Sequence, residues 1–156
     1  MKNAALNFLF GGLLVFWGSA RAYGALDIDK DNWSAKYKGA GETLNLPLPP
    51  RMDRYEWDRL KETKIGSDVF IEFFYWEPGL GSRTLTDVRV WVVYQVKGNE
   101  IAEVVQEDAG VREFDPKQPF KTKSQNLIKT RIRQNAAGKI EFIVNQRVVK
   151  TLTPSR

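Results

Sequence analysis

Carboxylates are the side chains of this sequence that could best perform acid–base chemistry. The chain has no histidine and no cysteine, which removes the usual nucleophile–base pairs and a general base that titrates near neutral pH. Glu72 and Glu77 lie in and beside an aromatic segment, and glycoside hydrolases use two such carboxylates. A half-buried Glu72 could serve as the acid. The simpler interpretation is that Glu72 pairs with a basic residue of a neighbouring strand.

Metal and cofactor sites have little support in the sequence. Without histidine or cysteine, a nitrogen- or sulfur-bound zinc site is excluded, and no glycine-rich phosphate loop is present. Alternate carboxylates at Asp27, Asp29 and Asp31 could hold a hard cation. The segment lacks the glycine and the distal glutamate of a calcium loop. We therefore predict no metal, no cofactor and a non-enzymatic protein.

A basic stripe runs through the last third of the chain. Residues 117–156 carry ten lysines and arginines but one acid, whereas residues 23–116 carry 18 acids and 12 bases. Such asymmetry favours an acidic partner, either an envelope protein or an anionic envelope polymer. It also permits oligomerisation, or simple neutralisation of one half by the other. We predict that the partner-binding residues of the basic stripe are Lys121, Lys123, Lys129, Arg131 and Arg133. Nucleic acid is not expected, because Phe142 is the only aromatic residue after Lys121.

Three aromatic residues form a second candidate site. Trp91 shares the more polar face of its segment with Asp87 and Arg89, and Trp76 or Phe74 on a neighbouring strand could lie beside it. Together they could form a flat platform for a sugar ring or for a side chain of a partner protein. The alternative is that all three belong to the core.

The first 22 residues resemble a secretory signal peptide. Lys2 precedes an apolar stretch, and "ARA" supplies the small residues that a signal peptidase reads. We predict cleavage after Ala22 and a periplasmic or secreted location. The alternative is an uncleaved anchor, which would be the protein's only contact with the membrane. The predicted organisation is a signal peptide over 1–22, an irregular N-terminal arm over 23–50 and one β-rich domain over 51–156.

One short helix and several strands should position these side chains. Asp53 and Glu56 have capping-box spacing, and Met52 could pack on Trp57, so we predict a helix over 54–64. The run 69–76 is apolar on both faces and predicts a central strand. A turn at Gly98 and Asn99 predicts a hairpin, with Val96 opposite Ile101 and Val92 opposite Val105. Residues 109–125 should form a loop or a short strand.

The basic stripe itself is predicted to form a three-stranded meander. A turn over 136–138 sets Ile132 opposite Phe142 and Arg133 opposite Glu141. A second turn at Asn145 and Gln146 sets Phe142 opposite Val149 and Glu141 opposite Lys150, which leaves Lys129 and Arg131 without an acidic neighbour. The fold class is thus an antiparallel β-sandwich or partly open barrel of six to seven short strands with one short N-terminal helix.

These observations favour an exported, non-enzymatic β-rich module that binds another macromolecule in the cell envelope. Such a module could be an accessory component of a secretion, conjugation or surface-assembly apparatus. A carbohydrate-binding domain that uses the strand aromatics is the first alternative. A carboxylate-dependent polysaccharide hydrolase is the second.

We expect the exported protein to begin at Tyr23. The segment "ARA" directly precedes this residue and supplies the small residues that a signal peptidase recognises. N-terminal sequencing of the protein recovered outside the cytoplasm checks this. An intact Met1 or Lys2 there would show that the segment is retained.

Overall fold

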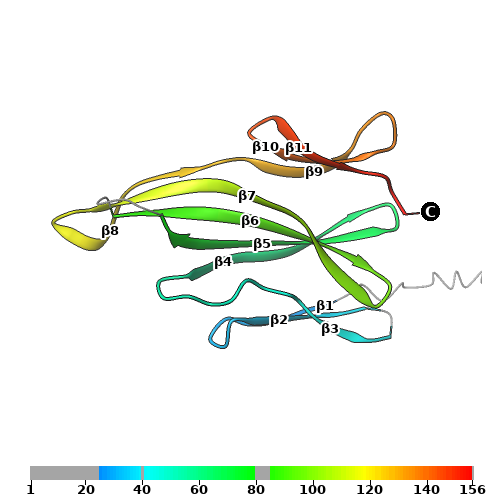
Figure 1. Cartoon of the computed structure of the whole chain (residues 1–156), viewed down its shortest axis with the longest axis horizontal. Coiled ribbons are helices and arrows are strands. Elements are labelled where there is room, and N and C mark those ends of the chain that lie inside the picture. The colour runs from blue at the N-terminus through cyan, green and yellow to red at the C-terminus, as the bar shows by residue number, and fades with distance from the viewer. Residues whose placement is uncertain (1–24, 40, 80–84, 156) are drawn as a thin grey trace, which may run out of the picture.

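The protein is built from β-strands throughout the described residues, which are 25–39, 41–79 and 85–155 of a computed structural model (Figure 1). No helix occurs among them, and so none that could cross a membrane. The strands are β1 (Ala25–Asp29), β2 (Ser34–Lys38), β3 (Thr43–Asn45), β4 (Glu56–Ile65), β5 (Asp68–Pro78), β6 (Thr86–Lys97), β7 (Glu100–Asp115), β8 (Gln118–Leu127), β9 (Thr130–Gln134), β10 (Ile140–Val144) and β11 (Arg147–Leu152). The predicted signal peptide lies outside the described residues.

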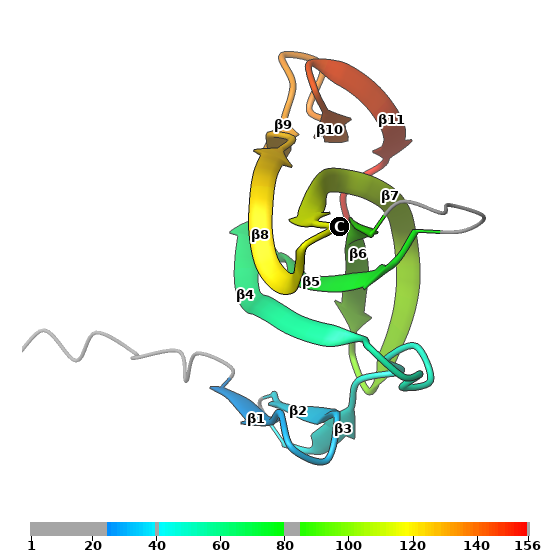
Figure 2. The same ribbon diagram turned by 90° about the vertical axis from the view of Figure 1, so that its left-hand side faces the viewer.

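The strands form three antiparallel sheets in three layers. A central sheet of order β4-β5-β6-β7-β8 lies between an N-terminal sheet, β1-β2-β3, and a C-terminal sheet, β11-β10-β9 (Figure 1). The central sheet curls into a half-barrel whose two edge strands, β4 and β8, turn towards each other (Figure 2). The prediction of an antiparallel, partly open barrel is therefore confirmed, although the predicted number of strands is too low and the predicted helix is absent.

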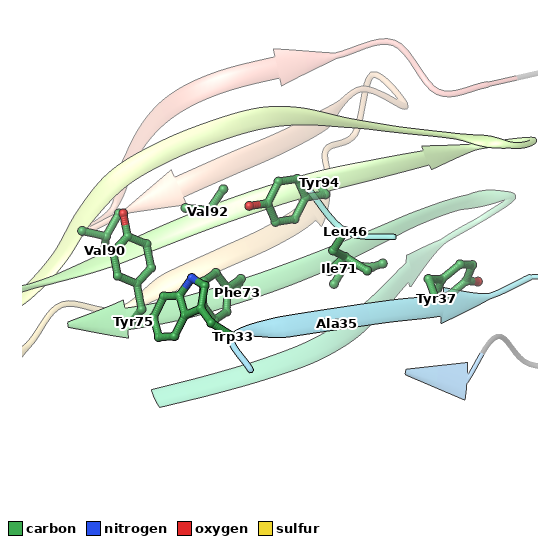
Figure 3. Packing of buried hydrophobic residues seen from close by; sticks show 10 residues of the cluster. All are labelled: Trp33, Ala35, Tyr37, Leu46, Ile71, Phe73, Tyr75, Val90, Val92 and Tyr94. Atoms are coloured by element: carbon green, nitrogen blue, oxygen red, sulfur yellow. The ribbon is translucent and has the colours of Figure 1, made fainter. Parts of the chain in front are cut away.

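The N-terminal sheet packs on one face of the central sheet through a cluster of aromatic rings. Trp33 lies at its centre, with ring centroids 5.7 Å from Phe73 and 6.0 Å from Tyr75 (Figure 3). It also contacts Tyr55 and Trp57 at 6.1 and 5.6 Å. Aromatic pairs at such distances add about 0.5–1.5 kcal/mol each beyond the area that they bury. These contacts hold the N-terminal layer against the half-barrel.

The C-terminal sheet packs on the opposite face. Phe142 of β10 is fully buried and meets Phe70 of β5 edge to face, with centroids 5.4 Å apart. The rest of this core is formed by Phe74, Trp91, Val93, Val105, Ala109, Ile140 and Val144. Burying a side chain of this size stabilises the fold by about 1.5–3 kcal/mol. Strands β5 and β6 are therefore covered on both faces, as the apolar pattern of 69–76 predicts.

The predicted helix over 54–64 is wrong, because this segment forms β4. Trp57 and Leu60 both pack against the core beneath the N-terminal sheet, and their spacing of three resembles a helical face. In the structure a β-bulge at Asp58 separates them, so two residues three apart share one face of a strand. Met52 is 61% exposed and does not pack on Trp57 as a staple would.

Two predicted irregular segments are also strands. Residues 25–45 contain β1, β2 and β3, where an irregular arm was expected, because Trp33, Ala35 and Tyr37 supply one apolar face. Residues 109–125, expected to form a loop or a short strand, belong to the long hairpin of β7 and β8. The strands cross closely at Gly110, where an added Cβ would lie 2.7 Å from the carbonyl oxygen of Asn126.

The predicted registers are correct near the turns and fail beyond bulges. Val96 faces Ile101 as predicted, but a shift between Val93 and Tyr94 sets Val105 opposite Val93 instead of Val92. In the C-terminal sheet, Ile132 faces Phe142 and Arg133 faces Glu141, and both turns occur where predicted. Beyond the second turn, a bulge between Phe142 and Ile143 sets Lys150 opposite Phe142 and Thr151 opposite Glu141. Lys150 therefore does not flank Glu141.

A buried carboxylate ties the C-terminal segment to the central sheet. Asp68 is 2% exposed and accepts hydrogen bonds from the Gln95 side chain at 2.9 Å, the Ser155 backbone N–H at 3.0 Å and the Ser155 hydroxyl at 2.8 Å. Residues 68 and 155 thus anchor the last residues after β11 beside the turn between β4 and β5.

We expect Asp68→Ala to lower the free energy of unfolding by about 2–3 kcal/mol, because Gln95 is left buried without its acceptor. Chemical denaturation of the full-length protein measures this. Asp53→Ala is the matched control: it should change stability by less than about 0.5 kcal/mol at an exposed turn. A cost of about 1 kcal/mol for Asp53→Ala would instead indicate a helix cap.

Candidate functional site

The upstream part of the basic stripe lies on β8, an edge strand of the central sheet. Every residue of β8 is exposed, including Lys121 and Lys123. β8 pairs with β7 alone, so its outer edge carries backbone N–H and C=O groups free to pair with another chain. Within the described ranges, neither lysine forms an ion pair.

The downstream part of the basic stripe lies at and beside β9, and it divides into a paired and an unpaired part. Arg133 donates to Glu141 at 2.9 Å, and hydrogen bonds from Asn135 and Arg133 lower the pKa of Glu141. Arg131 instead faces Ile143, and the Lys129 carbonyl accepts from the backbone of Asn145. In the described part of the chain, the Lys129 and Arg131 side chains form no ion pair. Arg133 is therefore structural, whereas Lys129 and Arg131 have no acidic partner, as the sequence predicts.

The candidate aromatic platform does not form, because all three rings are buried, and the alternative that they belong to the core is confirmed. Trp91 and Phe74 are completely inaccessible and Trp76 is 4% exposed. Trp91 does share its face with Asp87, Arg89 and Gln95, but the C-terminal sheet covers part of this face and ion pairs fill the rest. These residues offer no flat surface to a sugar.

The two candidate carboxylates, Glu72 and Glu77, do not form a catalytic pair. Glu72 lies on the face of β5 that carries Phe70, and Glu77 lies on the opposite face with Tyr75, since strand residues alternate. Glu72 accepts a hydrogen bond from Thr63 at 2.6 Å and pairs with Lys61 at 2.9 Å. The expected pairing with a basic neighbour strand is thus confirmed.

The described residues contain no cluster of three or more acidic, histidine or cysteine side chains that could hold a metal ion. Asp29, one of the three carboxylates considered for a cation, is instead bound to Asn32. Its two oxygens accept from the Asn32 side chain at 2.7 Å and from the Asn32 backbone at 3.0 Å.

A cavity that the sequence did not predict lies at the open end of the half-barrel. It has a volume of about 650 Å³ and lies between the first residues of β4 and β8. Its lining combines charged and apolar side chains from four segments of the chain: Arg54, Glu56, Leu85, Asp87, Arg112, Phe114, Pro119, Phe120 and Thr122. Phe120 is 98% exposed, which makes it the most accessible large apolar side chain among the described residues.

Ion pairs centred on Asp87 form the floor of this cavity. The Asp87 carboxylate is almost inaccessible and accepts from Arg54 at 3.0 Å and from Arg112 at 2.9 and 3.0 Å. Arg112 also donates to Glu56. Burial lowers the pKa of the Arg112 guanidinium, but hydrogen bonds to Glu56 and Asp87 raise it by more, so the net pKa lies above its usual value. The floor is therefore fixed and its charges are balanced.

Aromatic rings hold the guanidinium groups in place. Arg112 lies 4.6 Å from the Trp76 ring centroid and 5.1 Å from that of Phe114, within the range of a cation–π contact. Arg89 lies 4.1 Å from the Phe74 centroid and pairs with Asp58. Trp76 thus supports the charged floor through Arg112, whereas Phe74 packs on Arg89.

The opposite end of the half-barrel is closed. Strands β4 and β8 run in the same direction, because each neighbouring pair between them is antiparallel. β9 follows β8 and contacts β4, and Ile132 of β9 shares a core with Ile65 at the end of β4. Among the described residues, the end where β4 and β8 begin has both sheet edges beside a cavity.

Comparison with known proteins finds no match to this chain among protein-family models, curated proteins or solved structures.

We expect Asp87→Ala to destabilise the protein by about 3 kcal/mol, because it leaves the largely buried Arg112 without its main partner. Thermal or chemical unfolding of the full-length chain measures the loss. Asp108→Ala, at an exposed carboxylate of β7, is the control and should be nearly neutral. Equal stability of the two variants would contradict the structural role of the Asp87 ion pairs.

Proposed function

We propose that this protein is an exported, non-enzymatic β-rich module that binds an acidic region of another protein in the cell envelope. Edge strand β8 and the adjoining start of β9 form the binding surface, through Lys121, Lys123, Lys129 and Arg131. A role as an accessory part of a secretion, conjugation or surface-assembly apparatus is consistent with such a module.

The exposure of β8 along its whole length carries this proposal. A long, unpaired edge strand is a template for association, and proteins commonly protect such edges with lysines. Lys121 and Lys123 oppose pairing between two copies of β8, since like charges would meet. The same lysines attract an acidic segment and accelerate its association. An acidic partner therefore fits this edge better than a second β8 does.

Export and the lack of enzymatic activity are supported by other observations. The first 22 residues have the pattern of a signal peptide, which supports a partner in the periplasm or outside the cell. The sequence offers no histidine or cysteine, and Glu72 and Glu77 lie on opposite faces of β5. Binding rather than catalysis is the function that these features support.

We expect the double variant Lys121→Glu/Lys123→Glu to bind immobilised poly-L-glutamate at least about tenfold more weakly than the wild type, because attraction becomes repulsion at β8. Binding is measured by biolayer interferometry at low and physiological salt. The wild-type affinity should fall as salt screens the charges.

Lys30→Glu/Lys38→Glu is the matched control. It makes the same change in net charge at two exposed positions of the N-terminal layer. An equal loss of binding in both double variants would mean that net charge alone governs the interaction. The assignment of the binding surface to β8 would then be wrong. An envelope extract passed over the wild type and the β8 variant, followed by mass spectrometry, identifies the natural partner.

A further inference from the structure

We propose that the open end of the half-barrel is a docking site for an extended acidic strand of the partner protein. The strand pairs with the free edge of β8 and inserts one aromatic side chain into the cavity beside Phe120. This inference rests on the proposed function and adds to it the conformation of the partner and the residue that anchors it.

The position of the cavity favours an extended ligand. Pro119, Phe120 and Thr122 of β8 line one side, and Arg54 and Glu56, at the start of β4, line the other. Both edges are unpaired at this end. A strand that adds to β8 would therefore run over the mouth of the cavity. Main-chain hydrogen bonds supply affinity in such strand addition, and pockets for alternate side chains supply specificity.

The lining of the cavity favours an aromatic side chain. Leu85, Phe114, Pro119 and Phe120 form its apolar part, and Arg54 presents a guanidinium that is half exposed. Guanidinium groups and aromatic edges both bind the face of a ring. A volume of about 650 Å³ is ample for one side chain and part of its backbone. An inserted ring would also cover Phe120, which is otherwise exposed to water at a cost in free energy.

The positive charge of β8 favours acidic residues on either side of the aromatic anchor. Side chains of an added strand alternate between the two faces of the sheet, so an acidic residue beside the anchor can approach Lys121 or Lys123. The floor of the cavity is neutral overall, because Asp87 and Glu56 balance Arg54 and Arg112. Charge recognition is therefore assigned to β8 and anchoring to the cavity.

Three synthetic peptides test this arrangement against the full-length protein by fluorescence anisotropy. The first is a fluorescein-labelled peptide of alternating glutamate and threonine with a central tryptophan. The second has alanine in place of the tryptophan. The third keeps the tryptophan but carries N-methyl groups on every backbone amide, which removes the donors along both edges of the strand.

We expect the tryptophan peptide to bind at least about tenfold more tightly than the alanine peptide, because a pocketed aromatic anchor dominates such interfaces. N-methylation should weaken binding by a similar factor. Phe120→Ser should reduce the preference for tryptophan over alanine to about one. Val148→Ser, at another exposed apolar residue, is the control and should preserve the preference.

The outcomes distinguish a failure of the docking site from a failure of the proposed function. Equal binding of the tryptophan and alanine peptides, weakened by Lys121→Glu/Lys123→Glu, overturns the cavity assignment and leaves the basic edge intact. Unchanged affinity of the N-methylated peptide overturns strand pairing. Tighter binding of a uronic-acid polysaccharide than of any peptide overturns the assignment of a protein partner. Failure of every peptide and of poly-L-glutamate to bind overturns both proposals.

Discussion

The central strands β5 and β6 carry large apolar side chains on both faces, and this constraint determines the rest of the architecture. A single sheet cannot protect Ile71, Phe73 and Tyr75 on one side and Phe70 and Phe74 on the other from water. Burial therefore requires a layer on each side. The N-terminal sheet supplies one layer through Trp33, and the C-terminal sheet supplies the other through Phe142. Without a cysteine in the chain, no disulfide contributes to this assembly.

The same constraint explains why one end of the half-barrel is closed and the other is available. The C-terminal sheet covers the part of the concave face that holds Phe70 and Trp91. Beyond the C-terminal sheet, apolar packing is replaced by ion pairs of Asp87 with Arg54 and Arg112, and the Trp76 ring holds the Arg112 guanidinium in place. Polar groups of this kind tolerate water, so the end can remain open. The proposed binding edge lies where the hydrophobic layers stop.

The sequence predicted the features that depend on alternation and on turn chemistry. The double-sided apolar run of β5, the turn at Gly98 and the pairing of Arg133 with Glu141 all follow from local patterns. The predictions of a helix over 54–64 and of Lys150 opposite Glu141 failed. The capping-box spacing of Asp53 and Glu56 predicted a helix where the chain forms β4, and a bulge in the pairing of β10 with β11 moved Lys150 away from Glu141. A bulge leaves no simple mark in the pattern of apolar residues.

The cavity could not be predicted, because its residues come from segments that are distant in the sequence and meet only when the sheet curls. Phe120 lies between a proline and two lysines, a composition that favours a loop. One signal was present: an aromatic residue in an otherwise polar segment has no core to join. In the structure Phe120 lies with Leu85, Phe114 and Pro119 in one apolar lining, and such a contiguous exposed patch favours a contact surface. The acidic excess before residue 117 and the basic excess after it remain a prediction about partners rather than about the fold.

The central claim is that β8 is an available edge on a half-barrel held rigid by its two outer layers. Residue-resolved amide hydrogen exchange by NMR tests this most directly, on the free full-length protein and with the acidic tryptophan peptide added. The account predicts slow exchange throughout β5 and β6. It also predicts fast exchange for the β8 amides that do not donate to β7, and slower exchange of these same amides once the peptide is bound. Uniformly slow exchange along β8 in the free protein, or no change with the peptide, would contradict it.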